Sequence, residues 1–167
     1  PRSDRARLSN AAELNVRPLS DELWTMVGRT KKTTIAREQL EDGLLLLMQG
    51  RSISALTLLG AAEEVLARLL EESGGIHFLD DMWQGINDWN REQGGSDVPK
   101  RTVYRNFNEP RNSVKHHTPG EKAEVVIFKE AAALMMARRA LYAADQLKLK
   151  CKHRKSYADW VKGNGND

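Results

Sequence analysis

Charge, amide and imidazole groups are concentrated in one short stretch, residues 109–117, which reads Glu-Pro-Arg-Asn-Ser-Val-Lys-His-His. In a helix, residues four positions apart share a face, which would place Asn112 beside His116 and Arg111 beside Lys115. A histidine can transfer a proton near neutral pH, and an arginine offers a planar fork of donors that fits a phosphate. The stretch therefore predicts a site that acts on a phosphodiester.

The end of this helix is predicted from the proline at position 119 and the glycine that follows it. A residue before proline is pushed out of the α region, so the helix should stop at or near His117, with His116 in its last turn. Adjacent residues project about 100° apart on a helix, which makes the two histidines a poor chelate. One imidazole is expected to transfer the proton and the other to take no direct part in the reaction. We assign His116 as catalytic and His117 as supporting.

The order Arg111, Asn112, three residues and then His116 resembles the motif of the HEPN superfamily, in which an Arg and a polar residue precede a His. Residues 54–66 are also similar to the second helix of small bacterial HEPN-like proteins, so the resemblance spans roughly residues 33–149. It implies a helical bundle, usually dimeric, whose facing Arg and His residues form a metal-independent ribonuclease site. The family also includes members that only bind nucleotides or partners.

Apolar residues recur at helical spacing along most of the chain, which predicts an all-α, up-down bundle of about four to five main helices. Thr33 or Thr34 would cap the first helix and Ser52 the second. Within the fourth segment, Pro110 either kinks one helix or lies in the first turn of a new one. The last segment is apolar nearly all round, so it should be buried in the bundle or shared with a second subunit. The segments are residues 33–50, 52–74, 76–93, 100–117 and 121–149.

The chain of 167 residues has the size of one domain. We divide it into an arm at 1–32 with a short helix at 20–27, a bundle at 33–150 and a basic tail at 151–167.

No apolar run approaches the roughly 20 residues of a membrane span. The first residues lack the apolar core of a signal peptide, and Cys151 is the single cysteine, so a cytoplasmic location is expected. One cysteine with four histidines does not supply the ligand spacings of a structural zinc, and no metal or cofactor is predicted.

Two further features could support the motif. Glu63 falls at the edge of the apolar face of its helix, where a carboxylate needs a partner. It either pairs with Arg111 or Asn112 and orients the site, or lies at the surface rim. Lys100, Arg101 and Arg105 are interleaved with aromatic and apolar residues, a pattern that can hold single-stranded RNA or simply belong to a helix with an apolar stripe.

The predicted activity is cleavage of RNA by transesterification. One His would abstract the proton of the ribose 2′-hydroxyl, a second His would protonate the leaving oxygen, and Arg111 would stabilise the phosphorane. Because one chain supplies one motif, a homodimer would supply two. The alternative is a non-catalytic module that binds a nucleotide or a partner protein through Arg111, Asn112 and His116. A third hypothesis makes the protein the toxin of a toxin-antitoxin pair, with an antitoxin as partner.

Overall fold

The computed structural model describes residues 28–117, 119–120 and 122–164. The chain divides into two units, residues 1–30 and 31–167. The short helix predicted at 20–27 lies outside the described residues. The second unit is described below.

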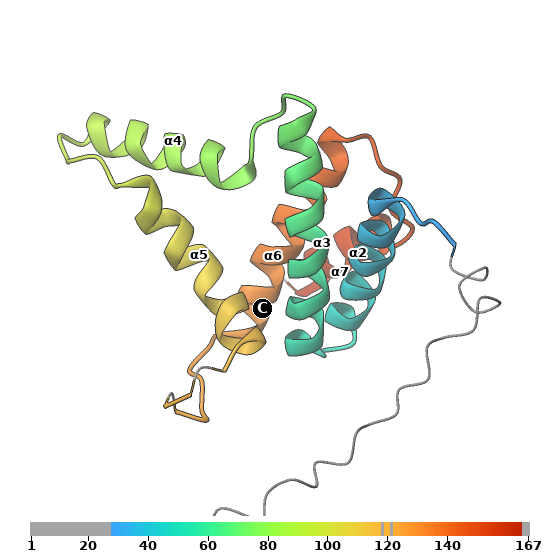
Figure 1. The fold of residues 1–167 in the computed structure, drawn as a ribbon. Helices are drawn as coiled ribbons and strands as arrows, with labels where there is room; N and C mark the ends of the chain where they lie inside the picture. Colours follow the sequence, from blue (N-terminus) through green and yellow to red (C-terminus); the bar gives the residue numbers. More distant parts are fainter. Residues whose placement is uncertain (1–27, 118, 121, 165–167) are drawn as a thin grey trace, which may run out of the picture. The chain divides into compact units, whose positions relative to one another are not determined.

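Within the described residues the second unit has six helices and no strand, which confirms the all-α prediction. They are α2 Lys32–Met48, α3 Ser52–Glu72, α4 Phe78–Glu92, α5 Lys100–Lys115, α6 Lys129–Gln146 and α7 Arg154–Asn164 (Figure 1). Among these residues no helix has both the length and the apolar character of a membrane span.

The apolar core is built around α3, which packs against both α2 and α6 (Figure 1). Leu56, Leu59 and Leu66 of α3 are fully buried, as their helical spacing predicts. α2 approaches α3 closely at Gly43, where an added Cβ would lie 2.7 Å from Cγ of Leu59. Burial of these leucines contributes to the stability of the unit.

Helix capping differs from the prediction at two helices. Lys31 and Arg51 occupy the N-cap positions of α2 and α3, so Thr33, Thr34 and Ser52 lie inside the first turns. Ser52 is buried, and its hydroxyl has no hydrogen-bond partner among the described residues. Neither Lys31 nor Arg51 makes a side-chain cap hydrogen bond, so the residue types that favour a cap predicted the helix starts only to within a few positions.

The predicted helix 121–149 was wrong at its start, because α6 begins at Lys129. The described residues 122–128 before it are not helical. Val125, Val126 and Ile127 form a β-branched run, which lowers helix propensity. Val126 is 103% and Phe128 86% exposed, so these two side chains are not buried within the unit, whereas Ile127 packs against the core. The alternative, a surface shared with a second subunit, stays a prediction.

The predicted basic tail, residues 151–167, contains α7. Tyr157 of this helix is buried, and Trp160 packs against the core. Leu149 and Cys151, just before it, also pack against the core. The C-terminal basic residues are therefore carried by a segment that adds to the core of the unit.

α4 and α5 form a hairpin that is held largely by polar contacts. Asn87 of α4 is buried, and it accepts a hydrogen bond from the backbone N–H of Val98 at 2.7 Å and donates one to its carbonyl at 3.2 Å. Asp80 accepts a hydrogen bond from the Tyr104 hydroxyl of α5 at 2.6 Å, and Lys100 Nζ lies 2.6 Å from the same oxygen. These contacts fix the position of α5, which carries the motif.

The Asp80 contacts make the stability of the hairpin depend on pH. Burial raises the pKa of the Asp80 carboxyl, but the hydrogen bonds from Lys100 and Tyr104, together with the nearby positive charge, outweigh it and lower the pKa below its usual value of 3.8. The stabilisation is therefore present above this usual value and is lost as the pH falls through the lower value of the folded protein. We expect the free energy of unfolding in urea to decrease in this acidic range more for the wild type than for Asp80→Asn. Asp81→Asn, at an exposed neighbouring position, is the control, and a pH dependence equal in the wild type and Asp80→Asn would contradict the prediction.

Candidate functional site

A buried carboxylate lies at the centre of the contacts between α3, α5 and α6. The Glu63 side chain is 3% exposed. Its Oε1 accepts hydrogen bonds from Arg139 of α6, at 2.7 Å from Nη2 and 3.1 Å from Nε. A buried charge is costly unless it is paired and hydrogen bonded, and this pair meets both conditions.

Arg139 also holds α5. Its Nη1 donates to the Phe107 carbonyl at 3.0 Å, and its Nη2 donates to Oδ1 of Asn108 at 2.9 Å. These bonds lie just before Pro110, which is inside α5 and contributes no backbone N–H to the helix. Arg139 thus connects three helices at the turn that precedes the motif. One helix runs through Pro110, as one of the two predicted alternatives requires.

Arg111 lies across α3 at Gly60. A Cβ added to Gly60 would lie 2.5 Å from Cδ of Arg111, so only glycine leaves room for this side chain. Arg111 Nη1 is 3.7 Å from Oε2 of Glu63 and 3.5 Å from Oε2 of Glu64. Glu63 therefore pairs with Arg111, one of the predicted partners, but holds Arg139 much more closely.

His77 also lies near the buried carboxylate, with Nε2 3.6 Å from Oε1 of Glu63. Its Nδ1 accepts a hydrogen bond from the backbone N–H of Leu79 at 3.0 Å, which caps α4. With Nδ1 accepting this bond, Nε2 is the ring nitrogen that can donate towards Glu63. The ring also stacks on Tyr104, with centroids 5.5 Å apart. His77 is thus engaged by α4 and α5 and serves to position them.

A basic cleft opens at the C-terminal end of α5. It is lined by both imidazoles of the motif, by cationic side chains from α5 and the following loop, and by two carboxylates. Those residues are His116, His117, Arg105, Lys115, Lys122, Glu109 and Glu124, together with Asn112. Three cations against two carboxylates leave the cleft positively charged, before any protonation of the imidazoles.

The position of His116 differs from the prediction. α5 ends at Lys115, and His116 is its C-cap with an extended backbone at φ −122° and ψ 145°. Its N–H still donates to the Asn112 carbonyl at 3.0 Å. His116 therefore lies just beyond the last turn, because the chain leaves the α region earlier than the proline at 119 alone requires. The helical rule that placed the imidazole beside the Asn112 side chain no longer applies.

The structure gathers some of the predicted site residues and separates others. Asn112, Lys115, His116, His117 and Arg105 share the cleft. Arg111 is not among the described residues that line the cleft. It contacts the cleft residue Asn112, whose Oδ1 is 3.4 Å from Nε and Nη2 of Arg111. Lys100 pairs with Asp80, and Arg101 is exposed on the first turn of α5.

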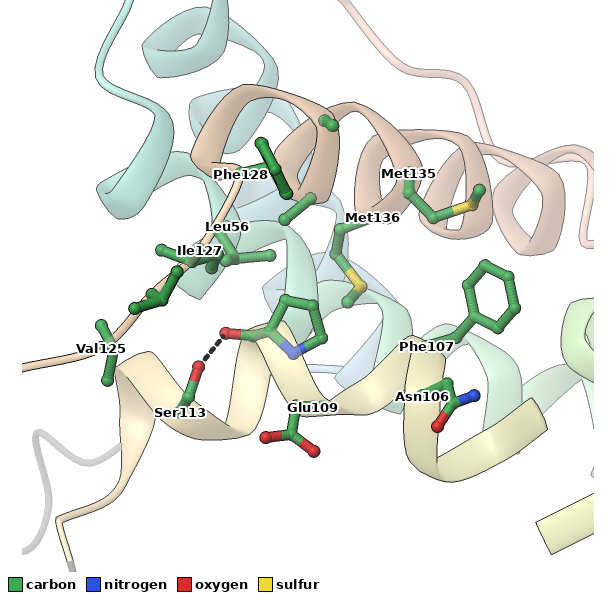
Figure 2. Close-up of a pocket in the computed structure, with 14 residues that line it drawn as sticks. Leu56, Asn106, Phe107, Glu109, Ser113, Val125, Ile127, Phe128, Met135 and Met136 are labelled. Carbon is green, nitrogen blue, oxygen red and sulfur yellow. Dashed lines mark hydrogen bonds between the residues drawn. The ribbon is translucent and has the colours of Figure 1, made fainter. Parts of the chain in front are cut away.

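An apolar pocket of about 520 Å³ adjoins the cleft and shares Glu109, Ser113 and Val125 with it. Figure 2 shows this pocket between α5 and the start of α6, with the hydrogen bond from Ser113 Oγ to the Pro110 carbonyl at 3.0 Å. Its other lining residues are mainly apolar and include Phe107, Ile127, Phe128, Met135 and Met136. Much of this apolar surface is open to solvent.

Arg139 and His77 are the site residues that sequence reasoning missed. Two adjacent arginines, Arg138 and Arg139, stand in an otherwise apolar helical segment, which signals that one of them could be buried beside a carboxylate but does not say which. His77 has no such signal, since histidine is not among the residues that favour an N-cap.

Among the described residues, no group of three His, Cys, Asp or Glu side chains is arranged to hold a metal ion. No protein-family model, curated protein or solved structure matches the chain. The function is therefore inferred from the residues of the site itself.

Proposed function

We propose that the protein is a metal-independent endoribonuclease of the HEPN type that binds single-stranded RNA in the cleft at the end of α5. The observation that carries this proposal is the presence of two imidazoles and three cationic side chains in one cleft. Imidazoles supply acid and base groups, and cations hold phosphates. Cleavage of RNA needs acid-base groups for proton transfer and cations that hold the phosphate.

In the proposed binding mode, Arg105, Lys115 and Lys122 contact the RNA phosphates. Arg105 and Lys115 belong to α5, and Lys122 reaches the same cleft from the loop after it. These contacts are electrostatic and do not distinguish bases, so binding should weaken as salt is raised. Glu109 and Glu124 also line the cleft, and their negative charges confine phosphate binding to the part of the cleft that holds the cations.

In the proposed reaction, one imidazole removes the proton from the ribose 2′-hydroxyl, whose oxygen attacks the phosphorus. A second imidazole gives a proton to the 5′-oxygen that leaves, which yields a 2′,3′-cyclic phosphate and a 5′-hydroxyl end. We propose that two His116 side chains from the two subunits of a homodimer supply these groups. The exposed Val126 and Phe128, which line the apolar pocket beside the cleft, support a dimer, because neighbouring exposed apolar side chains favour a partner.

One observation favours a second function, the non-catalytic binding of a nucleotide or a partner. Arg111 is directed towards Glu63 and Glu64 rather than into the cleft that holds His116. In this arrangement the cation predicted to stabilise the phosphorane is separated from the imidazole, whereas binding of an anion in the cleft needs no contribution from Arg111.

The test is incubation of a mixed RNA pool with the purified protein in excess EDTA, followed by analysis of the product ends. Cleavage that leaves cyclic phosphates, and that a Lys115→Gln/Lys122→Gln variant loses together with RNA binding, is the expected result. Binding without cleavage would replace the nuclease with the binding module. Neither binding nor cleavage by the folded protein would overturn both.

A further inference from the structure

Two arginines share one buried carboxylate, but they share it unequally. Arg139 is 2% exposed and uses its donors on Glu63, on the Phe107 carbonyl and on Asn108, at distances from 2.7 to 3.1 Å. The side chain of Arg111 is 16% exposed, and its closest polar contacts in the described part of the chain are at 3.4 Å or more. The Arg139 guanidinium uses four of its five N–H donors in short hydrogen bonds, and the Arg111 guanidinium is loosely held.

The charges of this cluster do not cancel. Glu63 supplies one buried negative charge, and the close hydrogen bonds of Arg139 take it up. The other carboxylate near Arg111 is Glu64, whose side chain is 57% exposed and therefore screened by water. The positive charge of Arg111 is thus only weakly compensated by neighbouring carboxylates. Its N–H donors also lack short hydrogen bonds.

We propose that Arg139 is a positioning residue that, by neutralising Glu63, leaves Arg111 able to bind an RNA phosphate beside the cleft. Arg111 contacts Asn112, which lines the cleft, so it is a cation beside the cleft that an RNA strand could reach. Without Arg139, the Glu63 carboxylate would be free to bind Arg111 closely and neutralise it. The proposal rests on the proposed RNA binding.

The test measures binding of a labelled 2′-O-methyl single-stranded RNA, which lacks the attacking hydroxyl, as a function of salt. Each phosphate contact contributes about 0.7 to the slope of log affinity against log salt for single strands. Arg139→Met should reduce the slope by about that amount and the affinity by about tenfold. In an Arg111→Met background, Arg139→Met should change the slope no further.

Arg139→Met leaves a buried charge and could fail to fold, so two further variants keep the proposal testable. Glu63→Gln/Arg139→Met removes both charges and should restore the slope, because Arg111 is again not neutralised. Glu64→Gln removes the exposed carboxylate and should raise affinity about two- to fivefold above Glu72→Gln, which makes the same charge change at an exposed position further along α3. Partial unfolding would reduce the active fraction and leave the slope unchanged.

The two proposals fail in different ways. If the wild type does not bind the RNA, the proposed function is overturned. If the wild type binds but Glu64→Gln matches Glu72→Gln, or the slopes of the folded Arg139 variants equal that of the wild type, RNA binding stands and the role of Arg139 is overturned.

Discussion

Replacement of Arg139 by Met is expected to lower the free energy of unfolding by about 3–5 kcal/mol, because it leaves the buried Glu63 carboxylate without its close partner. The substitution keeps much of the side-chain volume, so the loss comes from charge and hydrogen bonds. It also removes the bonds to the Phe107 carbonyl and Asn108 that hold α5 to α6. Urea unfolding followed by circular dichroism measures the change.

The matched control is Arg138→Met on the neighbouring residue. Arg138 is exposed, with its guanidinium carbon 5.9 Å from the centre of the Phe78 ring, and its replacement should cost about 1 kcal/mol or less. The double variant Glu63→Leu/Arg139→Met should recover most of the loss, since an apolar pair can replace a buried ion pair at little cost. Equal effects of the Arg138 and Arg139 substitutions would show that the buried pair does not stabilise the fold.

Replacement of His116 by Ala is expected to slow RNA cleavage in EDTA by about 10²- to 10⁴-fold, the usual contribution of an acid-base group. His116 is exposed in the cleft, so the substitution should leave the stability of the protein nearly unchanged. Initial cleavage rates at saturating RNA isolate the chemical step from binding.

The control is His153→Ala, which removes an imidazole at the start of α7, outside the residues that line the cleft in the described chain. It should cleave as the wild type does. A His116→Ala protein that cleaves at the rate of the wild type would exclude His116 as the acid or base. In that case His117→Ala becomes the informative variant, because His117 lines the same cleft.

The helices of the core could be predicted from the sequence because burial is periodic there. Leu40, Leu44 and Leu47 in α2 follow the spacing of one helical face and are buried. The same holds for Leu56, Leu59, Leu66 and Leu70 in α3. The start of α6 could not be predicted in the same way. Its apolar residues continue upstream through Val125 and Val126, where hydrophobicity suggests a helix but β-branching opposes it.

The site could be predicted only in part, because some of its residues are close together in the sequence and others are far apart. The group 109–117 is local, so its cations and imidazoles were visible together. Glu63 and Arg139 are 76 residues apart, and nothing in the sequence states that α3 and α6 bring them into contact. The direction of the Arg111 side chain depends on the missing Cβ of Gly60, which is a property of packing between helices.

The small number of buried residues in α4 and α5 has a consequence for how the protein opens. The buried residues are Leu79 and Asn87 in α4 and Val103 in α5, whereas α3 buries residues along its whole length. Amide hydrogens of α4 and α5 should therefore exchange with solvent through a local opening that leaves the leucine core intact. Because the cleft lies at the end of α5, we expect it to be lost when this hairpin opens. The hydrogen bonds of Arg139 and Asn87 are the main contacts that oppose this opening.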